Sequence, residues 1–402
     1  MAREVRGGDA DKRGGAKSET EVVRSGSLDD LLEAKEIVVA CGPGGVGKTT
    51  TAAALAAMAA SNHGGRVLVL TVDPARRLAD ALGLKGIGNS ATKVERSVFT
   101  DAGLTPRGEL WAAMLDMKES WDDLVCRHAP DEETRDQILR NPLYQNISGR
   151  FVQSHDYIAM ERLFELHSEG KYDLIVVDTP PTRNALDFLD APKRMADFFS
   201  SRLLRWLIVP YRSRLVNIAS KPFYQVADRI LGTQFIADIS EFFILFQSMY
   251  DGFLERSKSV TRLLSDQRTT FLVVSTLEVT PAREAEFFAT QLRARGLDLG
   301  AIVLNKVLPS YMRDPSVDRV AHVMKERSKG LAEGISSDPS LAAGVLEEVA
   351  ESFLNFEMVA RREHKQQVEL SSSSELLVTV PFFASDIYDM DGLLKLGAQI
   401  WD

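Results

Sequence analysis

Short apolar runs, rich in β-branched residues, recur along the chain and are separated by longer stretches with helical spacing. Seven such runs are present: EIVVAC (36–41), RVLVLTV (66–72), LWAAMLD (110–116), DLIVVD (173–178), TFLVVST (270–276), LGAIVLN (299–305) and ELLVTVP (375–381). Strands that are buried on both faces of a sheet have this continuous apolar character. The pattern therefore predicts a doubly wound α/β fold with a mainly parallel sheet.

Three stretches between these runs are too long for single crossovers and carry helical spacing, at about 117–165, 183–265 and 311–370. We expect these insertions to form a helical subdomain beside the sheet. In the second stretch, one helical face carries Phe235, Ile239, Phe242, Phe246, Met249 and Phe253. This stripe either packs inside the helical subdomain or lines a groove for an apolar client.

The N-terminal segment and one internal joint carry little apolar sequence. Residues 1–26 are rich in glycine, serine and charge, which predicts a disordered tail before a folded domain at 27–402. Four serines at 371–374 predict a flexible joint before the last strand. The N-terminus lacks the apolar core of a signal peptide, and no run is long enough to span a bilayer, so we expect a cytoplasmic protein.

Composition narrows the class of protein. The chain has 402 residues, of which 45% are hydrophobic and 26% charged, and its net charge is −9. A general nucleic-acid binder needs a basic surface to displace counterions from phosphates, so we expect no nucleic-acid partner. Cys41 and Cys126 are the only cysteines, which provides neither a disulfide framework nor a closely spaced pair for zinc.

The first predicted strand leads into a glycine-rich loop and a helix-forming segment, VVACGPGGVGKTTTAAA (38–54). Gly42, Gly47, Lys48 and Thr49 fit G-x-x-x-x-G-K-[ST] in the required strand–loop–helix context. Glycines let the backbone aim several N–H groups at phosphate oxygens, at the positive end of the helix. The lysine supplies a positive charge near the β- and γ-phosphates, and the threonine hydroxyl binds magnesium. The loop therefore predicts nucleotide binding, at a single site because the unit is not repeated.

Two aspartates follow predicted strands, at the edge of the sheet where ligands bind in such folds. Asp178 ends DLIVVD, and a carboxylate there contacts magnesium, commonly through water. The alternative is an ordinary strand that ends in a turn. Asp73, in LTVDPARRLADALG, is placed to orient an attacking water; the alternative is a cap on the next helix, because aspartate before proline often begins one.

These segments together resemble one family. GPGGVGKTT, VDPARRLADALG and YDLIVVDTPPTRNALDFL, in this order, resemble the ArsA-type ATPases, which include the arsenite-pump ATPase and the targeting factor for tail-anchored membrane proteins. LNKVLP and TVPFFASDIYDMDGLLKLG resemble the family's base-binding segments and its ending. The resemblance covers most of residues 36–401. VDPARRLADALG and DTPPTRNALDFLDAPKR are most similar to an actinobacterial branch whose members occur as paired paralogous subunits.

The resemblance implies a binding site for ATP and Mg²⁺. It implies that Lys48 and Asp73 are catalytic, with Asp73 orienting the water, and that Thr49 and Asp178 hold magnesium, the latter through water. The phosphate-binding residues would be Gly44, Gly45, Val46, Gly47, Lys48, Thr49 and Thr50. The residues at the adenine base would be Asn305, Pro381 and Phe382.

Several positions depart from the family's pattern. Pro43 stands where the commonest loop has a lysine that reaches the partner's phosphates, and proline has neither a cation nor an N–H. Three explanations are open. Another cation, such as Arg76, Arg77 or Arg183, replaces the missing lysine; a paralogous partner supplies the cation; or hydrolysis is slow. Arg183 and Asn184 replace a usual glycine and histidine in the second switch segment. The family's metalloid site needs several converging thiolates, and its zinc clasp needs a C-x-x-C pair. The two cysteines of this chain lie far apart in the sequence and therefore disfavour both sites.

One helical stretch is basic, although the chain as a whole is acidic. Between Lys193 and Arg229, eight basic residues stand against two acidic ones, interleaved with aromatic side chains. Such a stretch fits an acidic partner, an anionic membrane surface or a solvated helix face. We expect a homodimer or a heterodimer with a paralogous ATPase subunit, and a protein client or a peripheral membrane contact through 193–253.

The sequence thus predicts an ArsA-like ATPase that couples its nucleotide state to a helical region handling a partner or client. One alternative is a positioning ATPase of the ParA or MinD kind, against which the long helical insertions argue. Another is a weakly hydrolysing or non-hydrolysing regulatory subunit of a paralogous heterodimer. Pro43 favours this second alternative, whereas Asp73 and Asp178 argue against it.

Overall fold

The computed structural model describes residues 27–72, 77–147, 155–179, 190–191, 193–194, 197, 233–335 and 338–401. Within them, eight strands form one sheet in the order β3-β4-β2-β5-β1-β6-β7-β8. The strands are β1 Ile37–Cys41, β2 Arg66–Thr71, β3 Thr92–Lys93, β4 Glu109–Met114, β5 Leu174–Asp178, β6 Thr269–Ser275, β7 Leu299–Val307 and β8 Leu377–Pro381.

The strand pairing confirms the predicted fold class. Each of the seven apolar runs overlaps one strand, and these seven strands pair in parallel. β3 was not predicted: it contains only two exposed residues, pairs antiparallel with β4 and carries no apolar pattern. β1 lies between β5 and β6 and is buried along its whole length, so the loop that follows it starts from the middle of the sheet.

Helices cover both faces of this sheet. On one face, alternate strand residues pack with α1 Leu28–Glu33, α2 Lys48–Asn62, α3 Arg77–Ala81, α4 Arg96–Asp101 and α18 Met390–Trp401. On the other face the core includes residues of α5 Met117–His128, α8 His155–Ser168, α13 Tyr250–Leu264 and α14 Val279–Ala294. The remaining helices are α6 Glu132–Arg140, α7 Pro142–Ile147, α12 Thr233–Gln247, η2 Ser310–Arg313, α15 Pro315–Glu326, α16 Ser328–Glu333 and α17 Pro339–Ser371.

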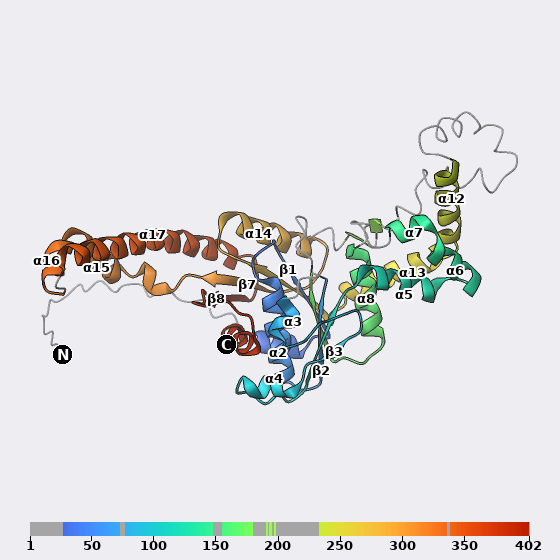
Figure 1. Ribbon diagram of the computed structural model, residues 1–402, viewed down its shortest axis with the longest axis horizontal. Helices are drawn as coiled ribbons and strands as arrows, with labels where there is room; N and C mark the ends of the chain where they lie inside the picture. The colour runs from blue at the N-terminus through green and yellow to red at the C-terminus, as the bar shows by residue number, and fades with distance from the viewer. Residues whose placement is uncertain are drawn as a thin grey trace, which may run out of the picture.

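Two helical groups extend from opposite sides of the sheet (Figure 1). One contains α5, α6, α7, α12 and α13, and the other is formed by α15, α16 and α17. In the first group, Phe242, Phe246, Met249 and Phe253 are buried, with ring contacts from Phe242 to Tyr144 and from Phe246 to Trp121. This described part of the predicted stripe therefore packs inside the helical group.

The last two of the four serines do not form a flexible joint, so that prediction is wrong for them. Ser373 and Ser374 are buried. The Ser373 carbonyl accepts a hydrogen bond from Arg293 at 2.5 Å, and the Ser374 hydroxyl donates to the Leu376 carbonyl at 2.8 Å. One hydrogen bond from α14 and one local bond therefore hold these two serines in place. Among the described helices, none is both long enough and apolar enough to cross a bilayer.

Candidate functional site

The loop between β1 and α2 requires glycine at two positions. Gly42 and Gly47 have φ angles of 142° and 96°, which side-chain-bearing residues rarely adopt. A Cβ atom at Gly42 would lie 2.1 Å from the Val274 carbonyl oxygen, and one at Gly47 would lie 2.3 Å from the Asn305 amide nitrogen. Gly44 and Gly45 are exposed at the outer turn. The loop thus presents bare backbone at the N-terminus of α2, where helix N–H groups favour an anion.

Lys48 is the first residue of α2 and its side chain is only 6% exposed. Its amine donates a hydrogen bond of 2.8 Å to the carbonyl oxygen of Pro43, so the side chain lies back across the loop. Pro43 therefore lacks a side-chain donor but provides a backbone acceptor for Lys48. The Lys48 charge, the glycine-rich loop and the positive end of α2 meet at this point. This combination binds phosphate.

Asp178 lies at the end of β5, beside β1 and β2 in the sheet. It is 1% exposed, and its Oδ2 accepts hydrogen bonds from the hydroxyls of Thr49 at 2.7 Å and Thr71 at 2.9 Å. The structure thus brings together Thr49 and Asp178, the two residues predicted to bind magnesium. A carboxylate and a hydroxyl are the hard oxygen ligands that Mg²⁺ takes in nucleotide sites.

Asn305 links the end of β7 to the loop. Its side-chain amide donates to the Val46 carbonyl at 2.8 Å, and its Oδ1 accepts from the Lys306 N–H at 2.9 Å. Lys306 has a φ of 60°, and the register of β7 against β8 shifts here. This contact joins residues 259 positions apart, and the sequence carries no signal for it. The resemblance implied a contact with adenine at Asn305 and gave no indication of this role.

Two further predicted residues lie beside the end of β7. Pro381 ends β8, and Phe382 follows it with 58% of its surface exposed. The Phe382 N–H donates to the Val307 carbonyl at 2.9 Å, so this segment is tied to the strand that carries Asn305. Asp73, Arg76, Arg183 and Asn184 lie outside the described residues, as does the side chain of Arg77.

A buried cysteine also adjoins the loop. Cys41 ends β1, and its thiol donates to the Leu272 carbonyl at 3.4 Å. Burial raises the pKa of this thiol well above its usual value, against the opposing effect of the Lys48 charge. Because the thiolate is the nucleophilic form, the raised pKa disfavours reaction at Cys41, which is buried in the core beside β6.

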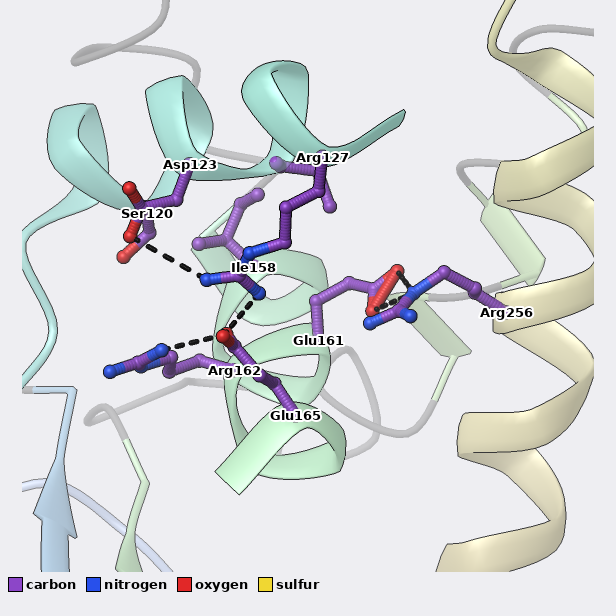
Figure 2. A pocket seen from close by; sticks show the side chains of 9 residues that line it. Ser120, Asp123, Arg127, Ile158, Glu161, Arg162, Glu165 and Arg256 are labelled. Carbon is purple, nitrogen blue, oxygen red and sulfur yellow. Dashed lines mark hydrogen bonds and ion pairs between the residues drawn. The ribbon is translucent and has the colours of Figure 1, made fainter. Parts of the chain in front are cut away.

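A second polar cluster, which the sequence did not reveal, lies between α5, α8 and α13 (Figure 2). Arg127 and Arg162 both contact Glu165, the latter at 2.7 Å. Arg256 contacts both carboxylate oxygens of Glu161, at 3.0 and 2.9 Å. Burial would raise the pKa of Glu165, but its two arginine partners outweigh burial and lower it.

Within this cluster the guanidinium groups form ion pairs with the carboxylates. Arg162 also donates to the Asn89 carbonyl at 3.0 Å, next to the edge of the sheet. The cluster therefore joins three helices to one another and to the segment before β3. Such paired charges stabilise an arrangement of helices.

Comparison with known proteins assigns the chain to a family. The model of the anion-transporting ATPase family matches residues 35–340. The chain is 27% identical over 290 residues to "ATPase ASNA1 homolog 1" of Paramecium tetraurelia, covering 70% of this chain and 78% of the relative. It is 26% identical over 285 residues to "ATPase GET3" of Malassezia globosa, covering 70% and 76%. An uncharacterized protein of Streptomyces coelicolor is 32% identical over 273 residues, covering 67% and 61%. The chain therefore belongs to the anion-transporting ATPase (ArsA) family.

Proposed function

We propose that the chain binds MgATP and hydrolyses it to ADP and phosphate. One observation carries the proposal: Lys48, Thr49 and Asp178 converge at a glycine loop on the positive end of α2. Membership of a family whose relatives are named ATPases supports it. The residues present fit the ligand, because they combine phosphate-directed N–H groups, a cation and hard oxygen ligands.

In this proposal the loop residues 44–50 grip the phosphates through their N–H groups. The Lys48 amine exchanges the Pro43 carbonyl for phosphate oxygens, which replaces a neutral acceptor by charged ones. Thr49 and Asp178 hold Mg²⁺, which when bound neutralises charge on the β- and γ-phosphates. Asp73 orients the attacking water, and Asn305, Pro381 and Phe382 border the base.

We further propose that the protein acts as a dimer, either with itself or with a paralogous subunit, and that its nucleotide state changes how the helical region handles a partner or client. A second candidate is a regulatory subunit with little turnover of its own. Pro43 favours it, because this loop has no side-chain cation to offer a partner's phosphates, and such a cation contributes about 10³–10⁵ in rate in related enzymes.

The test is steady-state MgATP hydrolysis by the purified chain, together with Asp73→Asn. We expect Asp73→Asn to bind ATP as the wild type does but to lose hydrolysis, because the water loses its orienting carboxylate. An Asp73→Asn protein with normal turnover would contradict the assignment. Turnover that rises more than linearly with protein concentration indicates a homodimer, whereas binding without turnover supports the regulatory candidate.

A further inference from the structure

Two hydroxyl groups converge on one oxygen of Asp178. Thr49 donates a hydrogen bond to Oδ2 at 2.7 Å, and Thr71 donates to the same oxygen at 2.9 Å. Thr49 and Asp178 have a task at the metal in the proposed function, whereas the hydroxyl of Thr71 has none. Thr71 thus contributes a buried donor to the site that no step of the proposed function uses.

The strand pairing places Thr71 beside Asp178. β2 and β5 run parallel, and Thr71 lies opposite Asp178 in their register. Side chains alternate between the two faces along a strand, so Thr71 shares a face with Val69. Asp178 likewise shares a face with Val176, and both valines belong to the core that contains α2. Thr71, Asp178 and the first turn of α2 therefore meet on one face of the sheet.

The backbone around Thr71 is held from both sides. The Thr71 carbonyl accepts a hydrogen bond of 2.9 Å from the N–H of Leu115, just after β4. On the other side, the N–H of Val72 donates to the Asp178 carbonyl at 3.2 Å. In addition, β-branched side chains such as that of threonine have a restricted choice of χ1 rotamers. The end of β2 therefore presents the Thr71 hydroxyl to Asp178 from a fixed position.

Burial makes this hydroxyl important for the charge of Asp178. Thr71 and Asp178 are each 1% exposed. A carboxylate that is removed from water is costly unless hydrogen-bond donors satisfy it. Main-chain hydrogen bonds already join β2 to β5, so the hydroxyl is not needed to pair the strands. Its effect falls instead on the orientation and the charge of the Asp178 carboxylate.

We propose that Thr71 is a positioning residue of the magnesium site, whose hydroxyl holds the Asp178 carboxylate in the orientation that receives the metal. The inference rests on the proposed function, because it assigns a role at the same MgATP site. In that function Thr49 turns its oxygen to the metal, whereas Thr71 continues to donate to Asp178. Partners that orient a metal ligand in this way change metal affinity or activity by about 10–100-fold when they are removed.

The test measures how strongly magnesium raises the affinity for nucleotide. A fluorescent, non-hydrolysable ATP analogue is titrated into the full chain in EDTA and at a series of free Mg²⁺ concentrations. Thr71→Val keeps the shape of the side chain and removes the donor. We expect it to raise the free Mg²⁺ concentration needed for half of the affinity increase by about tenfold or more. Affinity in EDTA should stay within about threefold of the wild type, because the loop N–H groups still hold the phosphates.

Two further variants separate positioning from packing. Thr71→Ser keeps the hydroxyl and should restore the Mg²⁺ dependence to within about threefold of the wild type. Thr269→Val is the matched control: it makes the same change at a fully buried strand threonine, whose hydroxyl donates to the Leu263 carbonyl at 2.7 Å. Thr269 begins β6, opposite the start of β1 and far along the strands from the loop, so its loss should leave the Mg²⁺ dependence unchanged.

A double-mutant cycle tests whether Thr71 acts through Asp178. Asp178→Ala removes the buried charge, so Thr71→Val in that background leaves no carboxylate short of a donor, which also protects the fold. We expect the second substitution to change the Mg²⁺ dependence by less than about twofold there. An undiminished effect would overturn the proposal, because Thr71 would then act on another group. Circular dichroism melting of each variant confirms folding.

Three other results would also overturn the proposal: a Thr71→Val protein with the Mg²⁺ dependence of the wild type, a Thr71→Ser protein as impaired as Thr71→Val, or a Thr269→Val protein that is impaired equally. In each of these cases the wild type still binds MgATP, so the proposed function stands. A wild-type chain whose nucleotide affinity does not rise with Mg²⁺ would instead overturn the proposed function, and this inference with it.

Discussion

Helices α2 and α17 differ in how the rest of the protein holds them. Twelve of the 15 residues of α2 are buried, and α18 packs so closely on it that a Cβ atom at Gly397 would lie 2.2 Å from Met58 Cγ. Only five of the 33 residues of α17 are buried. The core thus fixes the helix whose N-terminus carries Lys48, whereas α17 leaves apolar side chains uncovered. The core can therefore preorganise phosphate binding at the first helix, whereas most residues of the second lie outside the core.

The largest expected effect is at the fixed end of α2. We expect Lys48→Ala to lower the steady-state rate of MgATP hydrolysis by about a thousandfold, because it removes the positive charge nearest the transferred phosphate. Lys395→Ala on the exposed surface of α18 is the control and should leave the rate unchanged. A Lys48→Ala rate within a fewfold of the wild-type rate would mean that the loop does not hold the reacting phosphates.

The second effect tests the difference in packing directly. Ala56 of α2 is fully buried, so Ala56→Leu must displace neighbours and should lower the free energy of unfolding by about 1–3 kcal/mol. Val345→Leu on α17 enlarges a side chain that is 52% exposed and should change it by less than about 0.5 kcal/mol. Urea denaturation at a protein concentration where the chain is monomeric measures both. Equal destabilisation would remove the distinction between the two helices.

The contrast between the helices also separates what the sequence reveals from what it does not. The seven longer strands and the phosphate loop have local signals, namely continuous apolar runs and glycines at fixed spacing. The helical spacing of α17 is equally local, but spacing does not tell whether a face is covered. The Asn305–Val46 contact and the Arg256–Glu161 pair depend on positions brought together by the fold. Likewise, Ser373 is held by Arg293, which lies far from it in sequence.

A third, smaller effect concerns the link between β7 and the loop before α2. Asn305→Ala removes the donor to the buried Val46 carbonyl, and we expect nucleotide affinity to fall by about five- to tenfold, the equivalent of about 1 kcal/mol. Titration with a fluorescent ATP analogue measures the affinity. Asn305→Asp keeps the size but not the donor and should behave like the alanine variant. Normal affinity in both variants would show that the contact does not order the loop.

The smallest effect lies at the base of α17, where Glu363 accepts a hydrogen bond of 3.4 Å from the Leu308 N–H. Burial raises the pKa of Glu363, and the charge of Glu278 adds to the increase; the hydrogen bond from Leu308 and the charge of Arg362 oppose it without cancelling it. The folded state therefore holds this proton more tightly than the unfolded state. Its stabilising contribution is complete below the ordinary glutamate pKa and is lost as the pH rises through the raised value.

Because Glu363 is partly exposed, solvent screening keeps this contribution to a few tenths of a kcal/mol. We expect Glu363→Gln to unfold at slightly higher urea concentration than the wild type at pH 7, with the advantage disappearing near pH 4. Glu348→Gln, at an exposed position of the same helix, should show no such pH-dependent gain. If Glu363→Gln were instead less stable than the wild type at pH 7, the charged carboxylate would stabilise the contact between α17 and β7 rather than destabilise it.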